Sequence, residues 1–304
     1  DDEDDEEDDG GEVLPFIFDD RIHLTLEDAR KIVPDIELGD TIEEEVTPKD
    51  FGRVAASTAK QVVIQKIREA EKDVILKEFK DKEEEMVVGQ VAMEDLKNYY
   101  IDLGRTQGIL PKKEIIPGEK IKMGSSIKVY ISKVDVNGKG PVILLTRKHF
   151  GFVKRLFELE IPEINDGLIL VYSVAREPGV RTKIAVSSTN ERIDAVGSCI
   201  GEKGSRINRI IEELNGERID VIEYNNDPAK FIENALSPAR DLHVFITDEE
   251  EKQAYVIVND ENLSLAIGKK GLNVKLASRL THYKIDVKTI LQAKEAGINI
   301  IEGD

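Results

Sequence analysis

The chain has 304 residues, of which 40% are apolar, and its formal net charge is −18. The length suits two to four small domains, and the apolar content is sufficient to build buried cores. The sequence shows neither an apolar run that could cross a bilayer nor a signal peptide. A single cysteine, Cys199, excludes an internal disulfide and indicates a reducing, cytoplasmic location.

The first twelve residues carry ten acidic groups and no basic one. We expect residues 1–12 to be a disordered, solvated acidic segment. A role as an RNA mimic or as a polymerase contact is the alternative. The remaining residues have a net charge of −8, from 43 basic and 51 acidic groups, so phosphate binding requires a local basic surface.

Residues 13–82 predict a partial α/β N-terminal domain that ends in a long helix. The segment Arg21–Val46 has a strand-and-turn pattern and is too small to fold alone, so we expect sequence to be missing before residue 13. Residues 51–80 predict the helix, because apolar residues recur at spacings of three and four. This stripe, which we expect to pack in a core or between domains, consists of Ala55, Ala59, Val63, Ile67, Ala70 and Val74. Partner binding by the opposite face is the alternative.

Residues 83–148 predict an all-β domain. The strand-like runs are 86–92, 97–103, 108–110, 127–136 and 142–146, with Asn137-Gly138 as a hairpin turn between the last two. Five strands with one long connection predict an OB-fold barrel of the S-one type, which binds single-stranded RNA on an aromatic and basic face.

The barrel offers three aromatic side chains, Tyr99, Tyr100 and Tyr130, for stacking on bases. Strand alternation puts Tyr99 and Tyr100 on opposite faces, so at most one of these two can stack on RNA while the other packs. The Phe-Gly-x-Phe run of such barrels is absent, and Ile101-Asp-Leu-Gly104 stands in its place. The sequence therefore favours the following units as the main RNA-binding site.

From residue 149 onward the chain repeats one pattern twice. Residues 149–225 and 226–304 each read as helix, two strands, short helix, glycine loop, helix and strand. The loop is Ile200-Gly-Glu-Lys-Gly-Ser-Arg-Ile207 and, 67 residues later, Ile267-Gly-Lys-Lys-Gly-Leu-Asn-Val274. Repetition of the loop with its surroundings indicates a duplicated structural unit. The order and the Gly-x-x-Gly loop resemble type II KH domains, whose loop clamps about four nucleotides of single-stranded RNA.

The glycines fit this chemistry. The second glycine of each loop opens a helix, whose first backbone N–H groups lack intrahelical partners and lie at the positive end of the helix dipole. A side chain at either glycine would keep a phosphate away from these amides. The residues predicted to bind RNA are Gly201, Glu202, Lys203, Gly204, Arg206, Gly268, Lys269, Lys270, Gly271, Asn273, Lys275 and Arg279. The alternative is a simple bend with packing isoleucines, which two copies in the same context disfavour.

Charge is concentrated near the second loop. Residues 265–288 contain six basic residues and one acid, a local excess of +5. Cys199, next to the first loop, is interpreted as a small buried packing residue.

Several further stretches of the sequence are typical of one family. Those that resemble the NusA family of bacterial transcription elongation, termination and antitermination factors include Val46-Thr-Pro-Lys-Asp-Phe-Gly-Arg-Val54, Phe157-Glu-Leu-Glu-Ile-Pro-Glu-Ile164 and Leu263-Ser-Leu-Ala-Ile-Gly-Lys269. The order of long helix, barrel and two KH units also matches, so the predicted fold class is α+β and multidomain.

The resemblance implies a cytoplasmic, monomeric RNA-binding transcription factor without enzymatic activity, cofactor, metal or membrane contact. In that family the N-terminal domain docks on RNA polymerase, and the barrel and KH units bind nascent single-stranded RNA. The factor modulates pausing, termination and antitermination and joins other antitermination factors. The sequence departs at Ala195, where the family usually has proline, and at Tyr224 and Tyr283, where relatives often carry tryptophan. The head of the N-terminal domain is missing or replaced, which leaves the polymerase contact open.

Two other functions are considered. An RNA-decay enzyme would need a separate catalytic core, and the sequence contains no metalloprotease, paired-cysteine or P-loop motif. The histidines are scattered singly, which is typical of surface or packing residues: His23, His149, His243 and His282. A ribosome-associated RNA chaperone would bind RNA but not polymerase.

Overall fold

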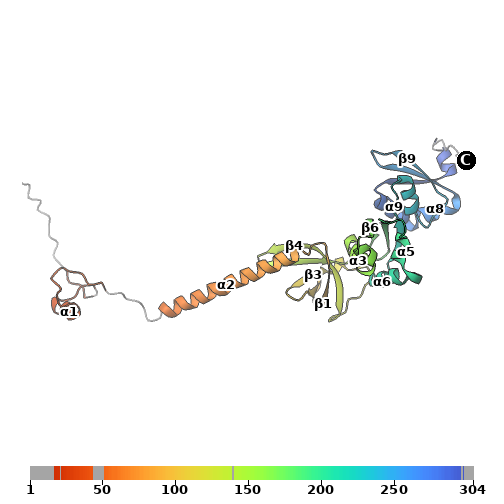
Figure 1. Ribbon diagram of the computed structural model, residues 1–304. Coiled ribbons are helices and arrows are strands. Elements are labelled where there is room, and N and C mark those ends of the chain that lie inside the picture. Colours follow the sequence, from red (N-terminus) through yellow and green to blue (C-terminus); the bar gives the residue numbers. More distant parts are fainter. Residues whose placement is uncertain (1–16, 21, 44–50, 139, 296, 298–304) are drawn as a thin grey trace, which may run out of the picture. The chain divides into compact units, whose positions relative to one another are not determined.

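The computed structural model of the chain describes residues 17–20, 22–43, 51–138, 140–295 and 297. The chain divides into two compact units, Asp1–Gln65 and Lys66–Asp304, and each is described by itself (Figure 1). The predicted acidic segment 1–12 lies outside the described residues. No helix within the described ranges is long and apolar enough to cross a membrane.

The first unit contains a short helix where strands were predicted. Helix α1 (Leu26–Ile32) begins at Thr25, whose hydroxyl accepts a hydrogen bond from the Asp28 N–H at 3.3 Å. Acidic residues occupy its first turn and basic residues its last, as the helix dipole favours. The strand prediction for Arg21–Val46 is therefore wrong over the described residues 22–43, because local capping outweighs the apolar pattern.

Helix α2 (Phe51–Lys80) confirms the predicted long helix, but its apolar stripe is not buried in a core. Val63, Ile67 and Val74 are each more than half exposed, and the only buried side chain of α2 is that of Phe79. The helix is about 45 Å long, and only its last two turns join the core of the barrel, through Ile75, Leu76 and Phe79.

A five-stranded barrel follows α2, as predicted. Its strands are β1 (Met86–Glu94), β2 (Asn98–Asp102), β3 (Gln107–Pro111), β4 (Ser126–Asn137) and β5 (Gly140–Thr146). They close in the order β1-β2-β3-β5-β4, with β3 and β5 parallel and the other pairs antiparallel. The interior is filled by alternate strand residues, including Val91, Ile101, Val129 and Leu145. This arrangement is that of an OB-fold.

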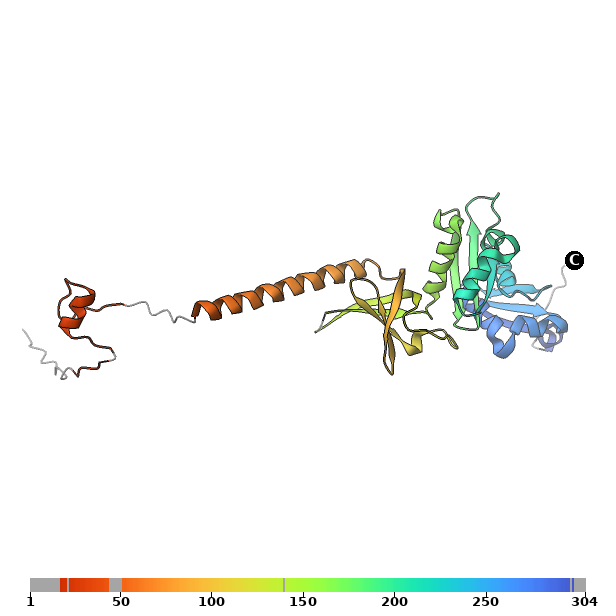
Figure 2. The same cartoon turned by 90° about the horizontal axis from the view of Figure 1, so that it is seen from below.

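The first KH unit has the predicted element order. Its elements are α3 (Phe150–Glu160), α4 (Pro162–Asn165), β6 (Ile169–Glu177), β7 (Arg181–Ser188), α5 (Ala195–Ile200), α6 (Ser205–Glu213) and β8 (Arg218–Glu223). The sheet runs β6-β7-β8, antiparallel between β6 and β7 and parallel between β7 and β8. Helices α3, α5 and α6 pack on one face of this sheet (Figure 2).

The second KH unit repeats the arrangement. Its elements are α7 (Pro228–Ala235), β9 (His243–Asp248), β10 (Gln253–Val258), α8 (Asp260–Ile267), α9 (Leu272–Thr281), β11 (Lys284–Thr289) and the additional helix α10 (Ile290–Glu295). The sheet order is β11-β10-β9, with β10 and β11 parallel. Both units therefore have the type II KH topology.

Local sequence sets the helix ends in both units. The carboxylates of Asp194 and Asp227 accept hydrogen bonds from the first-turn amides of α5 and α7 at 2.9 and 3.0 Å. Pro228 occupies the first turn of α7, where its missing N–H costs nothing. Asn215 and Gly216 take positive φ and end α6, as predicted for a helix C-terminus.

The barrel and the two KH units share apolar cores. Ile116 and Tyr130 of the barrel lie in the same buried cluster as the helices of the first KH unit. The other face of the first KH sheet, through Ala185 and Ile222, lies in one cluster with α7 and α9 of the second KH unit. Since neither face of that sheet is free, the three modules form one packed body.

Buried ion pairs reinforce these joints. Glu217 is fully buried and accepts hydrogen bonds from Arg176, from the Gly179 N–H at 2.8 Å and from the Thr182 hydroxyl. Arg176 in turn donates to the carbonyl oxygens of Arg147 and His149, at 2.9 and 3.0 Å, where the barrel joins α3. Lys183, also fully buried, donates to Asp220 and to the Ser237 carbonyl at the end of α7.

Replacing Glu217 by Ala is expected to lower the free energy of unfolding by about 3–5 kcal/mol, because Arg176 becomes a buried charge without its partner. Urea unfolding of the full chain measures this change. Replacing the exposed Glu212 by Ala is the control and should stay within about 0.5 kcal/mol of the parent. A loss at Glu217 no larger than at Glu212 would show that the pair adds nothing to the joint.

Candidate nucleic-acid interface

The two glycine loops have nearly the same backbone. The first glycines, Gly201 and Gly268, have φ/ψ of 75°/170° and 75°/172°, and the second glycines, Gly204 and Gly271, have 77°/16° and 73°/12°. The N–H of each second glycine donates to the carbonyl of its first glycine at 3.1 Å in both copies. The sequence repeat is therefore a structural repeat at the level of single dihedral angles.

The first glycines are required by both conformation and space. A φ near +75° with ψ near 170° lies in a region open essentially to glycine alone. A Cβ on Gly268 would lie 2.7 Å from the Asn273 Cβ, and a Cβ on Gly201 would lie 2.9 Å from the Arg206 Cγ. Each first glycine thus allows the helix after the loop to pack closely against the helix before it.

The second glycines leave the following helices open at their N-termini. Helices α6 and α9 begin at Gly204 and Gly271, which have no side chain to cap the first amides. A Cβ on Gly271 would meet nothing within 4 Å, so space remains in front of this helix end. The Ser205 and Leu272 N–H groups donate to the Glu202 and Lys269 carbonyls within the loops, so an anion such as a phosphate is favoured here chiefly by the positive end of the helix dipole.

The middle residues of both loops are exposed, as predicted. Lys203 and Lys270 take the left-handed conformation, with φ of 51° and 55°, and thus continue the sharp turn. The first loop carries Glu202 beside Lys203 and has no net charge, whereas the second carries Lys269 beside Lys270 and has two positive charges. Because of this charge difference, we expect the second loop to bind a phosphate more strongly than the first loop.

Two of the predicted RNA-binding residues are instead tied to the protein itself. Asn273 is 1% exposed, and its side-chain amide donates to three backbone carbonyls, so its placement among the RNA contacts is wrong. Arg206 is half-buried and donates to the Glu163 carboxylate and the Ser198 carbonyl, both at 2.8 Å. Asn273 is thus not free to bind a phosphate, whereas Arg206 is held by its Nη1 against α4 and the end of α5.

The predicted extension of the second loop along α9 is only partly free. Lys275, one turn beyond the loop, is exposed. Arg279 is about half exposed, and its Nη1 lies 3.8 Å from Glu177 of the first KH unit. Lys275 therefore remains the more accessible cation on this helix.

Of the three barrel aromatics, only Tyr100 reaches the surface. Tyr99 and Tyr130 are 9% and 4% exposed and belong to the cores, which corrects the inclusion of Tyr130 among the available rings. Tyr100 donates its hydroxyl hydrogen to Asp95 at 2.8 Å. Hydrogen bonds from the Lys97 backbone N–H and from Tyr100 lower the pKa of Asp95 to about 2, so a carboxylate lies beside this ring. This neighbour opposes a nucleic-acid phosphate.

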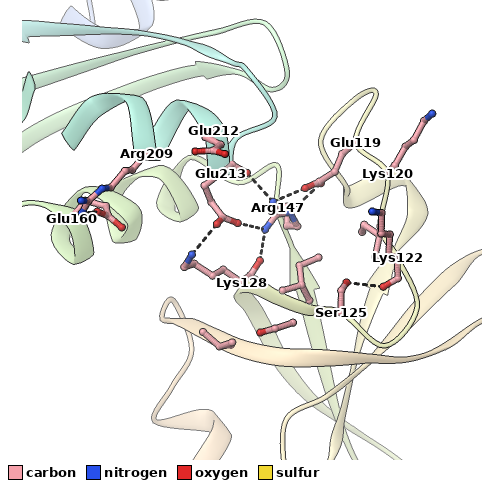
Figure 3. A pocket seen from close by; sticks show the side chains of 14 residues that line it. Glu119, Lys120, Lys122, Ser125, Lys128, Arg147, Glu160, Arg209, Glu212 and Glu213 are labelled. Carbon is pink, nitrogen blue, oxygen red and sulfur yellow. Dashed lines mark hydrogen bonds and ion pairs between the residues drawn. The ribbon is translucent and has the colours of Figure 1, made fainter. Parts of the chain in front are cut away.

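A groove of about 570 Å³ lies between the barrel and α6, as Figure 3 shows. Arg147, buried in its floor, donates to Glu119 at 2.5 and 3.0 Å and to Glu213 at 3.1 Å, while Lys128 pairs with Glu213 at 2.8 Å. The charged residues of its lining nearly balance in sign: Glu119, Lys120, Lys122, Lys128, Arg147, Glu160, Arg209, Glu212 and Glu213. The acidic and basic side chains of the groove therefore largely compensate each other, unlike the two lysines of the second loop, which have no acidic neighbour within the loop.

Comparison with known proteins agrees with this geometry. Residues 147–224 match the NusA-like first KH domain, residues 228–295 the NusA-like second KH domain, residues 10–73 the NusA N-terminal domain, and residues 80–146 the S1 RNA binding domain. The chain is 50% identical over 287 residues to the transcription termination/antitermination protein NusA of Bacillus subtilis, covering 94% of this chain and 77% of that protein. The Halalkalibacterium halodurans protein of the same name is 48% identical over 287 residues, with coverages of 94% and 75%. The chain belongs to the NusA family.

NusA membership confirms the resemblance inferred from the quoted phrases, and the S1 and KH matches make this chain an RNA-binding protein. The residues that sequence reasoning missed are those that form ion pairs between distant elements of this NusA chain, Arg147, Glu163 and Glu217 among them. Their partners lie 28 to 66 residues away along the chain. The available signal was weak: charged residues such as Arg176 and Lys183 stand within otherwise apolar strands.

Cys199 of this NusA chain is a packing residue, as predicted. It is fully buried in the core of the first KH unit, and burial raises the pKa of its thiol to about 12. The thiolate is the nucleophile, and at pH 8 almost none of it is present in the folded protein.

Native protein at pH 8 is therefore expected to resist alkylation by iodoacetamide, whereas protein unfolded in guanidinium should be alkylated at one site. Intact mass measured over a time course checks this. Alkylation of the native protein at the rate of a free small-molecule thiol would contradict the assigned burial.

Proposed function

We propose that this protein acts in transcription termination and antitermination, as an RNA-binding factor that associates with RNA polymerase and nascent RNA and modulates pausing. The observation that carries the proposal is the pair of equivalent, exposed Gly-x-x-Gly loops on one packed body. Two identical backbone clamps suit a single-stranded polymer that presents a phosphate at regular intervals. The NusA proteins it resembles bear termination and antitermination in their names.

The domain assignment that accompanies this proposal is an N-terminal polymerase-binding region over residues 13–82, the RNA-binding barrel over 83–148, and KH units over 149–225 and 226–304. The RNA-contacting residues are those of the loops and the accessible cations after them: Gly201, Glu202, Lys203, Gly204, Gly268, Lys269, Lys270, Gly271, Lys275 and Arg279. Asn273 is left out because its amide is buried and bonded within the fold, and Arg206 because its Nη1 is held by Glu163 and the Ser198 carbonyl.

The net charge of −18 is compatible with RNA binding because charge acts locally. Charges further apart than about 8 Å are largely screened at physiological salt. Residues 265–288 have an excess of +5, and three of their six basic residues lie in the second loop or one turn beyond it: Lys269, Lys270 and Lys275.

The remaining parts of the proposal concern partners and location. RNA polymerase and other antitermination factors are proposed as protein partners, and the chain is proposed to act as a cytoplasmic monomer without catalytic activity. Capture of polymerase by the tagged chain distinguishes this function from that of a ribosome-associated RNA chaperone, which would bind RNA but not polymerase.

Replacing Lys269 and Lys270 together by Gln is expected to weaken binding of a single-stranded RNA of about ten nucleotides, long enough for two four-nucleotide clamps. Each lysine that contacts a phosphate contributes about 0.7 to the slope of log affinity against log salt, so the slope should fall by about 1.4. Fluorescence anisotropy at several salt concentrations measures both quantities.

A matched control replaces Lys284 and Lys294, which are exposed and lie outside the loop, by Gln. This control removes the same charge and should leave the slope nearly unchanged. Equal effects of the loop and control variants would reduce RNA binding to a general charge effect and reject the clamp. The thermal unfolding midpoints of both variants should match that of the parent.

A further inference from the structure

The two residues withdrawn from the RNA contacts occupy the same place in the two KH units. Arg206 and Asn273 each follow the second glycine of their loop by two positions, in the first turn of α6 and of α9. Each lies against the first glycine of its own loop, at the contact that only glycine permits. Arginine and asparagine differ in size and charge, so their equivalence is not evident from the sequence.

Asn273 links three elements of the second KH unit. Its Nδ2 donates to the carbonyls of Leu265 and Ala266, at 3.2 and 3.0 Å, in the last turn of α8. It also donates to the carbonyl of Leu236, at 3.0 Å, where α7 ends. The last carbonyls of a helix have no intrahelical partner, so this one side chain ties the end of α8 to the end of α7.

Arg206 makes the corresponding links in the first KH unit. Its Nη1 donates at 2.8 Å to the carbonyl of Ser198, which stands three positions before Gly201 as Leu265 stands three before Gly268. The same nitrogen lies 2.8 Å from Glu163 of α4, at the end of the first helical segment of that unit. An ion pair here replaces the amide-to-carbonyl bond of the second unit.

We propose that Arg206 and Asn273 are positioning residues for RNA binding: each fixes its glycine loop by latching the helix before the loop to an earlier helix of its KH unit, α4 for Arg206 and α7 for Asn273. The inference rests on the proposed RNA-binding function and adds which side chains set the loop geometry. A free loop would lose entropy on binding, whereas a latched loop presents its amides in place.

The structure provides a matched pair of ion pairs with which to test this role. Glu163 pairs with Arg206 at 2.8 Å. A second pair joins the same two helical segments: Glu160, three residues before Glu163, lies 3.5 Å from Arg209, three residues after Arg206. Arg209 is 71% exposed and latches no loop. The variants are Glu163→Ala and Arg206→Met, with Glu160→Ala and Arg209→Met as controls of the same charge change.

Glu163→Ala and Arg206→Met are each expected to weaken RNA binding about three- to tenfold, the effect of losing one hydrogen bond of ordinary net strength, with little change in the salt slope. The two changes combined should cost no more than either alone, because both break one latch. The control variants should bind within about twofold of the parent.

A direct RNA contact by Arg206 predicts the opposite behaviour of Glu163→Ala. Removing the internal acid would free the guanidinium, so affinity would stay the same or rise, and Arg206→Met would lower the salt slope by about 0.7. Either result overturns the proposal. Since Glu163 cannot itself attract phosphate, a loss of affinity on its removal has no electrostatic explanation.

Asn273→Asp tests the second unit, because an aspartate of the same size cannot donate to the three carbonyls as a carboxylate. Reduced affinity in a folded protein supports the latch, and unchanged affinity in a folded protein overturns it. If this variant unfolds, the Glu163 and Arg206 variants decide the matter alone. Failure of the parent protein to bind RNA through Lys269 and Lys270 would reject the proposed function, whereas inert Glu163 and Arg206 variants beside an active loop would reject only the latch.

Discussion

The close approach of two helices across each glycine loop is the constraint on which the proposed interface depends. Gly201 and Gly268 have no Cβ, so the first turn of the following helix packs directly against them. The N-termini of α6 and α9 follow directly, and no side chain caps them. Any larger residue would separate the helices and would also require a backbone conformation that side chains avoid.

The loops belong to a body whose modules are packed against one another through buried cores. The sheet of the first KH unit is covered on one face by its own helices and on the other by helices of the second KH unit. At these joints the buried Glu217 pairs with Arg176, and the buried Lys183 pairs with Asp220 and donates to the Ser237 carbonyl. Such pairs add little net stability over apolar packing, but they penalise alternative arrangements that would leave a charge unpaired. The mutual orientation of barrel and KH units is therefore specified by burial and by polar pairing together.

The parts of the fold that sequence reasoning predicted are those governed by contiguous residues. The glycine spacing and the Asp227-Pro228 helix start each depend on dihedral preferences of neighbouring residues, and the structure contains both. The hairpin between β4 and β5 is also present, but the prediction of Asn137-Gly138 as its turn is wrong, because Asn137 belongs to β4 and pairs with Gly140. Helix α1 was not predicted, because its apolar residues are scattered and its main local signal is the capping residue Thr25. The apolar spacing correctly predicted that α2 is a helix, but such spacing does not show whether another element covers the apolar face.

The candidate site was predicted only as far as its backbone. Loop residues such as Lys269 are exposed as expected, because a short turn between two helices has no neighbour to bury it. The roles of Arg206 and Asn273 depend on Glu163 and Leu236, which lie 43 and 37 residues away, and no local pattern reports such contacts. Arg206 and Asn273 were predicted to contact RNA only because they follow the Gly-x-x-Gly loops in the sequence.

The central claim is that one backbone clamp occurs twice and that the two copies differ chiefly in the charge of the loop. Exchanging that charge tests it most directly: Glu202→Lys, Lys269→Glu and the combination are compared by anisotropy on one RNA of about ten nucleotides. Equivalent clamps predict that the first variant binds more tightly than the parent, the second less tightly, and the combination nearly as the parent, at constant net charge. Loss of binding in the combination equal to that of Lys269→Glu alone would show that the first loop does not bind RNA as the second does.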